Sequence, residues 1–193
     1  VVARLTTAGL PPLGKTHMTE LAFSGLGLNP VTASPPCVND AQAVSGGSSS
    51  GSAAAVAFGL APLAIGSDTG GSVRLPAAWN DLVGLKTTAG RVPLTGVVPL
   101  AARFDTVGPL ARSVEDAALG FALLDARPAP DLRGAGLEGA RLAVLETVAL
   151  DGLDPSVAAG FDDALARLAA AGARVGGVRG PAGTVPRSSS GWE

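Results

Sequence analysis

Two turns built from glycine and serine carry the candidate chemistry of this sequence. Residues 46–51 read Gly-Gly-Ser-Ser-Ser-Gly, and residues 66–72 read Gly-Ser-Asp-Thr-Gly-Gly-Ser. Each turn stands at the expected start of a helix, so its backbone N–H groups converge where the helix dipole adds positive potential. Such a cluster can bind a phosphate or stabilise an oxyanion. Only one helix and one strand are expected between the two turns. The presence of both turns so close in sequence favours a functional site over two ordinary helix caps.

Other motifs match these turns less well. Residues 47–51 have the G-x-S-x-G spacing of a nucleophile elbow, but that motif needs a strand before it and a histidine after it. Residues 40–45 make a poor strand, and the single histidine, His17, lies upstream. Residues 68–70 (Asp-Thr-Gly) follow an apolar run as in aspartic proteases, which pair two such carboxylates. The alanine-rich sequence disfavours that alternative, in which the chain would be half of a dimeric, β-rich protease.

The composition argues against several classes of ligand. Neither turn has the G-x-x-x-x-G-K-[ST] spacing of a nucleotide-binding P-loop. One histidine, one cysteine and no pair of carboxylates at helical spacing disfavour a metal site. The net charge is −2 without a basic cluster, so direct binding of nucleic acid is not expected. We therefore expect no metal and no cofactor.

The sequence also bears on the compartment. Its single cysteine, Cys37, cannot form an internal disulfide, which fits a reducing compartment. The longest apolar stretch, residues 53–65, is too short to span a membrane and is interrupted by Gly59 and Pro62. The first residues do not have the pattern of a secretory signal. A cytoplasmic location without membrane contact is the expectation.

The order of the expected elements favours an α/β fold. Helices are expected at 1–8, at 52–58, from the second turn to 79, at 113–124 and at 155–171, and strands at 61–65, 82–86, 141–147 and 173–178. A long loop is expected over 30–45. A loop of this length inside a compact domain is usually functional. Residues 1–180 are predicted to belong to one partial domain without an internal linker, and residues 181–193 to be a disordered tail.

A serine nucleophile in this chain needs an unusual base. With a single histidine far upstream of the turns, lysine is the obvious alternative for activating a serine. The sequence holds two lysines, Lys15 and Lys86.

Several ordered blocks of the sequence resemble the amidase signature family. The glycine- and serine-rich signature of that family is similar to residues 46–57, 66–78 and 83–88, and further family segments are similar to residues 14–20 and 104–117. The resemblance extends to about residue 125, and beyond residue 134 it is only a compatible pattern of helices and strands. It implies a mixed central sheet covered by helices, and the hydrolysis of a carboxylic amide through an acyl-serine intermediate.

The resemblance also implies roles for individual residues. Members of the family use a Ser-cisSer-Lys triad, in which Ser72 is the expected nucleophile and Ser48 relays protons to the lysine. The cis peptide bond is expected between Ser48 and Ser49. The expected oxyanion hole consists of the backbone N–H groups of Thr69, Gly70, Gly71 and Ser72. Asp68 and Arg74 are expected to brace these loops.

The sequence departs from the family pattern at the base. The family lysine lies on a strand upstream of the block matched by residues 14–16, before this chain begins, so Lys15 and Lys86 match other positions and are interpreted as structural. The family domain also continues past residue 193, and the chain is expected to be partial at both ends.

The expected substrate is a small-molecule amide, and a homodimer is one expected assembly. Alternatives are the glutaminase-type amidase subunit of a tRNA-dependent amidotransferase, which needs partner subunits, and a non-catalytic truncated product.

Overall fold

The computed structural model describes residues 1–179, which fall into two compact units, residues 1–131 and the residues from 132 onward. The first unit holds both glycine- and serine-rich turns and is built around a three-stranded sheet in the order β1-β3-β2. Its strands are β1 (Leu63–Asp68), β2 (Val83–Gly84) and β3 (Thr106–Ala111). Both neighbours run antiparallel to β3, so the end of β1 at Asp68 lies opposite the start of β3 at Thr106.

The central strand β3 is not among the strands that the sequence predicts, whereas those expected at 61–65 and 82–86 are present with shifted bounds. Gly108 and Pro109 interrupt the local strand pattern of β3. Gly108 is required because a Cβ there would overlap the carbonyl oxygen of Leu85. The N–H of Leu85 in turn donates to the carbonyl oxygen of Pro109 at 3.1 Å. Burial of all six residues, rather than local propensity, thus makes this segment a strand.

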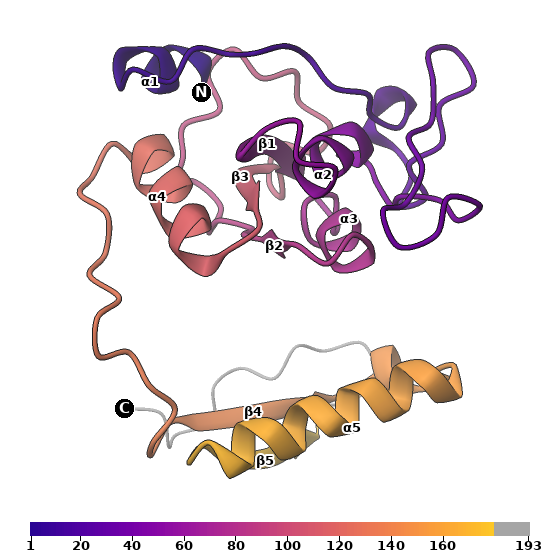
Figure 1. Cartoon of the computed structure of the whole chain (residues 1–193), viewed down its shortest axis with the longest axis vertical. Coiled ribbons are helices and arrows are strands. Elements are labelled where there is room, and N and C mark those ends of the chain that lie inside the picture. The colour runs from indigo at the N-terminus through magenta and orange to yellow at the C-terminus, as the bar shows by residue number, and fades with distance from the viewer. Residues whose placement is uncertain (180–193) are drawn as a thin grey trace. The chain divides into compact units, whose positions relative to one another are not determined.

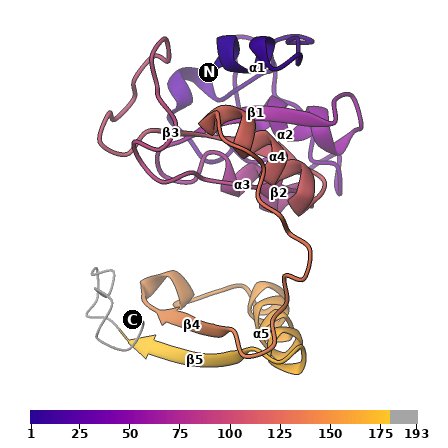
Figure 2. The ribbon, with the colours of Figure 1, turned by 90° about the vertical axis from the view of Figure 1, so that its left-hand side faces the viewer.

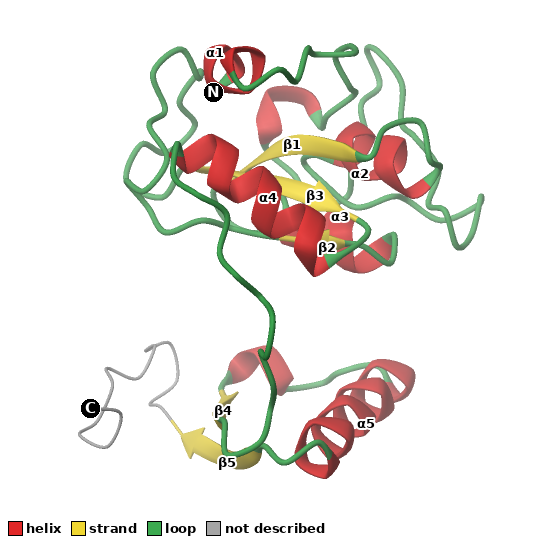
Figure 3. Ribbon diagram, turned by 60° about the vertical axis from the view of Figure 1, so that its left-hand side comes forward, coloured by secondary structure: helices red, strands yellow, loops and turns green. Residues whose placement is uncertain are grey.

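Helices cover both faces of this sheet (Figures 1 and 3). They are α1 (Val2–Thr7), α2 (Ser50–Ala57), α3 (Arg74–Trp79) and α4 (Val114–Asp125). Successive side chains of a strand point to opposite faces. Accordingly Leu110 packs with Ala53 of α2 and Ala77 of α3, whereas Val107 packs with Leu124 of α4. The two turns are therefore held on the side of the sheet that α2 and α3 cover.

Helix capping agrees with the sequence at α4 and differs at α2. The side chain of Ser113 accepts the N–H of Asp116 at 3.1 Å, as the capping pattern predicts. The serine-rich turn does precede α2, but its N-cap residue, Ser49, makes no side-chain capping bond. Ser49 Oγ instead donates to the carbonyl oxygen of Ser67 at 3.3 Å. Ser49 therefore links α2 to β1 instead of capping the helix.

The chain between α1 and α2 is irregular, as the sequence predicts. It contains one short 3-10 helix, η1 (Glu20–Ala22), and a single bridge between Pro36 and Val44 within the expected loop over 30–45. The segment is tied to the first turn by two backbone bonds. The N–H of Thr19 donates to Ser48 O at 3.0 Å, and the N–H of Gly51 donates to His17 O at 2.9 Å.

The second unit is a β-α-β motif whose two strands and long helix lie close to where the sequence predicts them, whereas its short 3-10 helix was not expected (Figure 2). Its elements are β4 (Arg141–Glu146), η2 (Val148–Leu150), α5 (Pro155–Ala170) and β5 (Arg174–Arg179). β4 and β5 pair in parallel, and α5 begins after Asp154, whose side chain accepts the N–H of Ser156 at 2.9 Å. That 1–180 forms one domain stays a prediction, and the expected tail over 181–193 lies outside the described residues.

Replacing the buried Leu110 by alanine tests this core. Leu110 is fully buried between β3, α2 and α3, so Leu110→Ala is expected to lower the free energy of unfolding of the first unit by about 2–5 kcal/mol. Leu60→Ala is the matched control, because Leu60 is 75% exposed, and it should stay within about 0.5 kcal/mol of wild type. Urea titration followed by Trp79 fluorescence in a Trp192→Phe background measures both. Equal effects of the two substitutions would contradict this core.

Candidate active site

The second turn is anchored at the point where β1 ends. β1 delivers Asp68 into the interior, where it is fully buried. The hydroxyl of Thr106 on β3 donates to the carbonyl oxygen of Asp68 at 2.7 Å. The backbone entering the turn is therefore fixed by the sheet, and the turn runs from Thr69 to Val73 before α3 begins.

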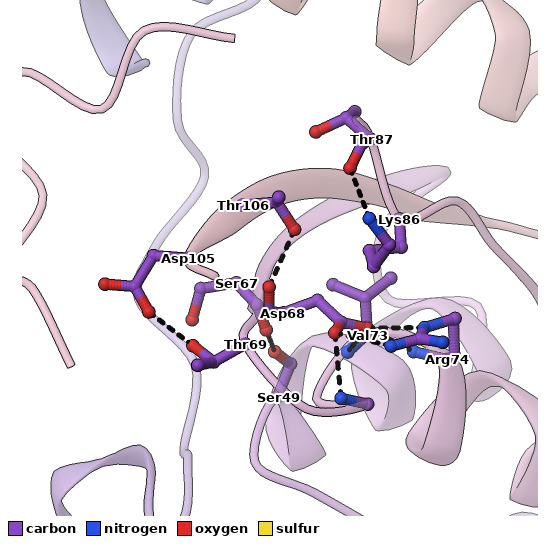
Figure 4. A network of polar contacts seen from close by, with 11 residues as sticks. Ser49, Ser67, Asp68, Thr69, Val73, Arg74, Lys86, Thr87, Asp105 and Thr106 are labelled. Atoms are coloured by element: carbon purple, nitrogen blue, oxygen red, sulfur yellow. Dashed lines mark hydrogen bonds and ion pairs between the residues drawn. The ribbon is translucent and has the colours of Figure 1, made fainter. Parts of the chain in front are cut away.

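The carboxylate of Asp68 holds the rest of the turn (Figure 4). Asp68 Oδ1 accepts the N–H of Gly71 at 2.8 Å, and Asp68 Oδ2 accepts those of Val73 and Arg74 at 3.1 and 3.3 Å. The Arg74 guanidinium adds a bidentate pair, with Nε and Nη2 each 3.0 Å from a carboxylate oxygen. Five N–H donors thus converge on one buried carboxylate.

These contacts keep Asp68 ionised. Burial alone raises the pKa of Asp68, but the hydrogen bond from Arg74, the N–H of Val73 and the charge of Arg74 outweigh it and hold the pKa below its usual value. The same hydrogen bond raises the pKa of Arg74. Because the folded pKa of Asp68 is the lower one, its contribution to stability is complete above the unfolded value of about 3.9 and is lost as the pH falls through the folded pKa.

The first turn contains a cis peptide bond between Gly47 and Ser48. The expectation of a cis bond between Ser48 and Ser49 is therefore wrong by one residue. The surroundings of residue 47 require a glycine, since a Cβ there would lie 2.6 Å from Gly27 N and from Thr19 Oγ1.

Ser48 lies at the centre of this turn with an unused hydroxyl. The residue is fully buried, and Ser48 Oγ has no hydrogen-bond partner among the described residues. The same holds for Ser45 Oγ and Ser50 Oγ on either side. Leaving a buried hydroxyl unpaired costs about 1–3 kcal/mol. Such a group in a native structure therefore calls for an explanation, and a functional role is one.

The two turns lie against each other, as the sequence predicts. The backbone N–H of Ser49 donates to the carbonyl oxygen of Ser72 at 3.1 Å, and Ser49 Oγ donates to Ser67 O at 3.3 Å. These bonds place Ser48 next to a residue that is bonded directly to Ser72. Ser72 itself is half-buried.

The four residues expected to form an oxyanion hole differ in their surroundings. Gly70 is exposed, Thr69 is half-buried and Gly71 is buried. The N–H of Gly71 points to Asp68, so in this conformation it is engaged by the anchor. Gly71 has a φ of +139°, a conformation that L side chains rarely adopt, and this requires a glycine.

Sequence reasoning assigned no role to Asp105, which contacts the second turn. Thr69 Oγ1 donates to Asp105 Oδ1 at 2.6 Å. Asp105 immediately precedes β3, so its position becomes apparent only once β3 is known to pair with β1. The lone sequence signal is an acidic residue directly before a buried segment.

Neither lysine is bonded to a serine of the turns. Lys86 Nζ donates to the carbonyl oxygen of the next residue, Thr87, at 2.7 Å, as Figure 4 shows. Lys15 is exposed. The structure therefore leaves the base for a serine nucleophile unassigned among the described residues.

A cavity of about 530 Å³ adjoins the first turn and β1. One part of its lining is Ser49 and Ser52 of the turn and α2 together with residues 65–67 of β1. Residues 16–18 and 95–97 contribute further walls, and residues 1–3 and Val107 complete the lining. The cavity thus combines serine hydroxyls with an apolar surround.

Other kinds of site find little support. Among residues 1–179, no group of three or more His, Cys, Asp or Glu side chains is placed to hold a metal ion. Within the same part of the chain, no helix has both the length and the apolar character needed to cross a membrane. Cys37 is buried, and its Sγ donates to the carbonyl oxygen of Trp79 at 3.1 Å.

Comparison with known sequences gives a consistent result. The family model described as Amidase matches residues 1–184. The 2-amino-5-chloromuconic acid deaminase of Comamonas testosteroni is 45% identical over 181 residues, which cover 91% of this chain and 39% of that protein. A glutamyl-tRNA(Gln) amidotransferase subunit of Symbiobacterium thermophilum is 44% identical over 191 residues, which cover 91% of this chain and 38% of that protein.

Solved structures agree with the sequence comparison. A crystal structure of an amidase superposes with a TM-score of 0.83 and 39% identity, covering 92% of this chain and 40% of that one. The corresponding glutamyl-tRNA(Gln) amidotransferase subunit of Thermotoga maritima superposes with a TM-score of 0.85 and 33% identity, covering 92% and 42%. The chain thus spans 38–39% of the length of these curated relatives. The chain belongs to the amidase family, and it has the mixed α/β fold of the amidase signature enzymes.

Proposed function

We propose that the whole protein hydrolyses a carboxylic amide with Ser72 as its nucleophile. The observation that carries this proposal is the hydrogen bond from Ser49 N–H to Ser72 O, which joins the two serine-bearing turns. Attack of Ser72 Oγ on the amide carbonyl forms a tetrahedral oxyanion, and cleavage of the C–N bond releases the amine and leaves an acyl-serine. Water then cleaves the acyl-serine to release the acid and restore the hydroxyl. The reaction needs no cofactor.

Ser48 is the proposed proton relay between Ser72 and a base. Its hydroxyl is buried without a partner among the described residues, so it is free to accept a proton from Ser72 Oγ and to donate its own. The same relay run in reverse delivers a proton to the leaving amine. By resemblance to the family the base is a lysine, and neither Lys15 nor Lys86 occupies the matching position. We therefore assign the base to a part of the whole protein outside these 193 residues.

The turn from Thr69 to Ser72 is the proposed oxyanion hole. Asp68 holds the N–H of Gly71, so in this conformation the N–H groups of Gly70 and Ser72, with that of Thr69, are the proposed donors to the oxyanion. Donors fixed before the reaction are worth more than donors that must reorient during it. Asp68 and Arg74 support the site by fixing this turn, without touching the substrate.

A second candidate function is that of the amidase subunit of a tRNA-dependent amidotransferase. It is favoured by the 44% identity to the amidotransferase protein of Symbiobacterium thermophilum. In that case the amide is a glutamine side chain, ammonia is the released amine, and partner subunits are required. A stand-alone amidase acts on a small amide without partners, as a monomer or a homodimer.

A third alternative is a truncated product that keeps the turns without activity. Hydrolysis of simple amides by the isolated protein favours the stand-alone enzyme.

Covalent labelling by a serine-directed fluorophosphonate tests the nucleophile. A form extended upstream to include a lysine-bearing segment is expected to be labelled at Ser72, as located by peptide mass spectrometry. Ser72→Ala should abolish the label, and Ser48→Ala should slow labelling by about 10²-fold or more, because general base catalysis contributes about 10²–10⁴-fold. Ser156→Ala, which replaces an exposed serine of α5, is the matched control and should react as wild type.

Two results would contradict this assignment. A label that persists in the Ser72→Ala variant would place the nucleophile elsewhere. Rapid labelling of the 193-residue chain alone, lost in Lys86→Met or Lys15→Met, would place the base on one of these lysines.

Substituting Asp68 tests the support of the oxyanion turn. Asp68→Asn leaves three backbone donors and the half-exposed Arg74 guanidinium facing an amide, which has only one oxygen to accept from them. It should lower the free energy of unfolding by about 1–3 kcal/mol, the cost of leaving buried donors unpaired. Arg74→Met should cost less, because three backbone N–H groups still donate to the buried Asp68 carboxylate when the half-exposed guanidinium is removed. The matched control is Asp154→Asn, which replaces an exposed N-cap by another good N-cap. Urea midpoints at pH 7 measure all three, and an Asp68→Asn as stable as Asp154→Asn would be evidence against the anchor.

A further inference from the structure

Asp105 closes a loop upon itself and ties it to the oxyanion turn. Its carboxylate accepts the N–H of Leu100 at 2.9 Å and that of Ala101 at 3.0 and 3.1 Å, while the N–H of Asp105 donates to Ala101 O at 3.0 Å. Residues 100–105 are thus a closed loop. The remaining side-chain contact, from Thr69 Oγ1 at 2.6 Å, leads out of this loop to the turn (Figure 4).

The closed loop continues a segment that also lines the cavity. Thr95, Gly96 and Val97 belong to the cavity wall, which Ser49 and Ser67 share. Residues 95–105 therefore run from the cavity beside the first turn to the start of the second. Displacing this segment would change the cavity wall and the contact with Thr69 at the same time.

Asp105 and Asp68 hold different parts of the turn. Asp68 accepts bonds from Gly71 and Val73 of the turn and from Arg74 at the start of α3. Asp105 contacts Thr69, in the first half, where Gly70 is exposed. The contact is short, at 2.6 Å, and the hydrogen bond from Thr69 is the first cause that holds the pKa of Asp105 below its usual value. Hydrogen bonds to an ionised acceptor are about twice as strong as those between neutral groups.

We propose that Asp105 is a positioning residue, which holds Thr69 and the cavity-lining segment 95–105 in register so that the oxyanion turn and the cavity wall act as one unit. The proposal rests on the proposed function, because the turn supplies oxyanion donors only if the protein cleaves amides. Asp105 touches no reacting atom and acts through Thr69. Its geometric part is nevertheless testable without activity.

Amide hydrogen exchange of Gly71, followed by NMR on the 193-residue chain at neutral pH, reports opening of the turn. The N–H of Gly71 is bonded to Asp68 and buried, so its exchange requires the turn to open. Thr69→Val removes only the hydroxyl donor and should accelerate exchange about tenfold, the effect of one hydrogen bond to a charged group. Asp105→Asn replaces the charged acceptor of this bond by a neutral one and should accelerate exchange by a smaller factor. Thr69→Ser keeps the donor and should restore the wild-type rate.

A double-mutant cycle separates coupling from general loosening. The Thr69→Val/Asp105→Asn double variant should exchange no faster than the more damaged single variant, because both substitutions act on the same contact. Asp154→Asn, in the second unit, is the control and should leave the Gly71 rate unchanged. A wild-type rate in Thr69→Val, equal acceleration in Thr69→Ser, or fully additive effects would each overturn the proposal.

The outcome can be separated from that of the proposed function. Coupling between Thr69 and Asp105 is read from exchange rates, whereas the role of Ser72 is read from fluorophosphonate labelling. Coupling with a label that survives Ser72→Ala would retain the link between segment 95–105 and the turn while removing the amidase assignment. Where Ser72 is labelled, Thr69→Val should lower the labelling rate about tenfold and Thr69→Ser should restore it.

Discussion

The buried carboxylate of Asp68 is the constraint on which the site depends. A carboxylate this deeply buried remains ionised only if hydrogen bonds and a counter-charge replace its water. Three backbone N–H groups and the Arg74 guanidinium do so. Satisfying Asp68 therefore dictates the path of the chain from Gly71 into α3. The glycine at 71 follows from that path, because its φ of +139° excludes most side chains.

The rest of the first unit brings the second serine-bearing turn to this anchor. Antiparallel pairing of β1 with β3 fixes the backbone of Asp68 through Thr106, and burial of Leu110 holds α2 and α3 on one face. α2 then presents Ser49, which bonds to Ser72 and to β1. The site is thus formed where the two turns contact each other, and neither turn forms it alone. This explains why the glycine- and serine-rich residues are divided between two short segments.

The elements that depend mainly on neighbouring residues could be predicted from the sequence. The Ser113 cap, the Asp154-Pro155 helix start and the apolar run of β1 were all interpretable from neighbouring residues. β3 was not, because Gly108 and Pro109 obscure its strand character and only tertiary burial makes it a strand. The cis bond lies one residue earlier than expected, and the close packing of Gly47 against Gly27 and Thr19 involves residues distant in sequence, which local patterns do not reveal.

The same distinction applies within the site. Asp68 and Arg74 lie only six residues apart, and the two turns that pair are the two glycine- and serine-rich motifs. Both features could therefore be expected from the sequence. The contact between Thr69 and Asp105 spans 36 residues and exists because β3 aligns with β1. A role for Asp105 was therefore inaccessible before the strand pairing was known.

The pKa of the Asp68 carboxyl, measured by ¹³C NMR titration of the folded chain, tests the anchoring of the turn most directly. We expect the midpoint of this carboxyl to lie below the usual value of about 3.9, because the donors around it outweigh its burial. Removing the guanidinium in Arg74→Met should raise that midpoint. A wild-type midpoint above the usual value would show that burial outweighs the five donors, and it would contradict the anchoring of the turn by an ionised Asp68.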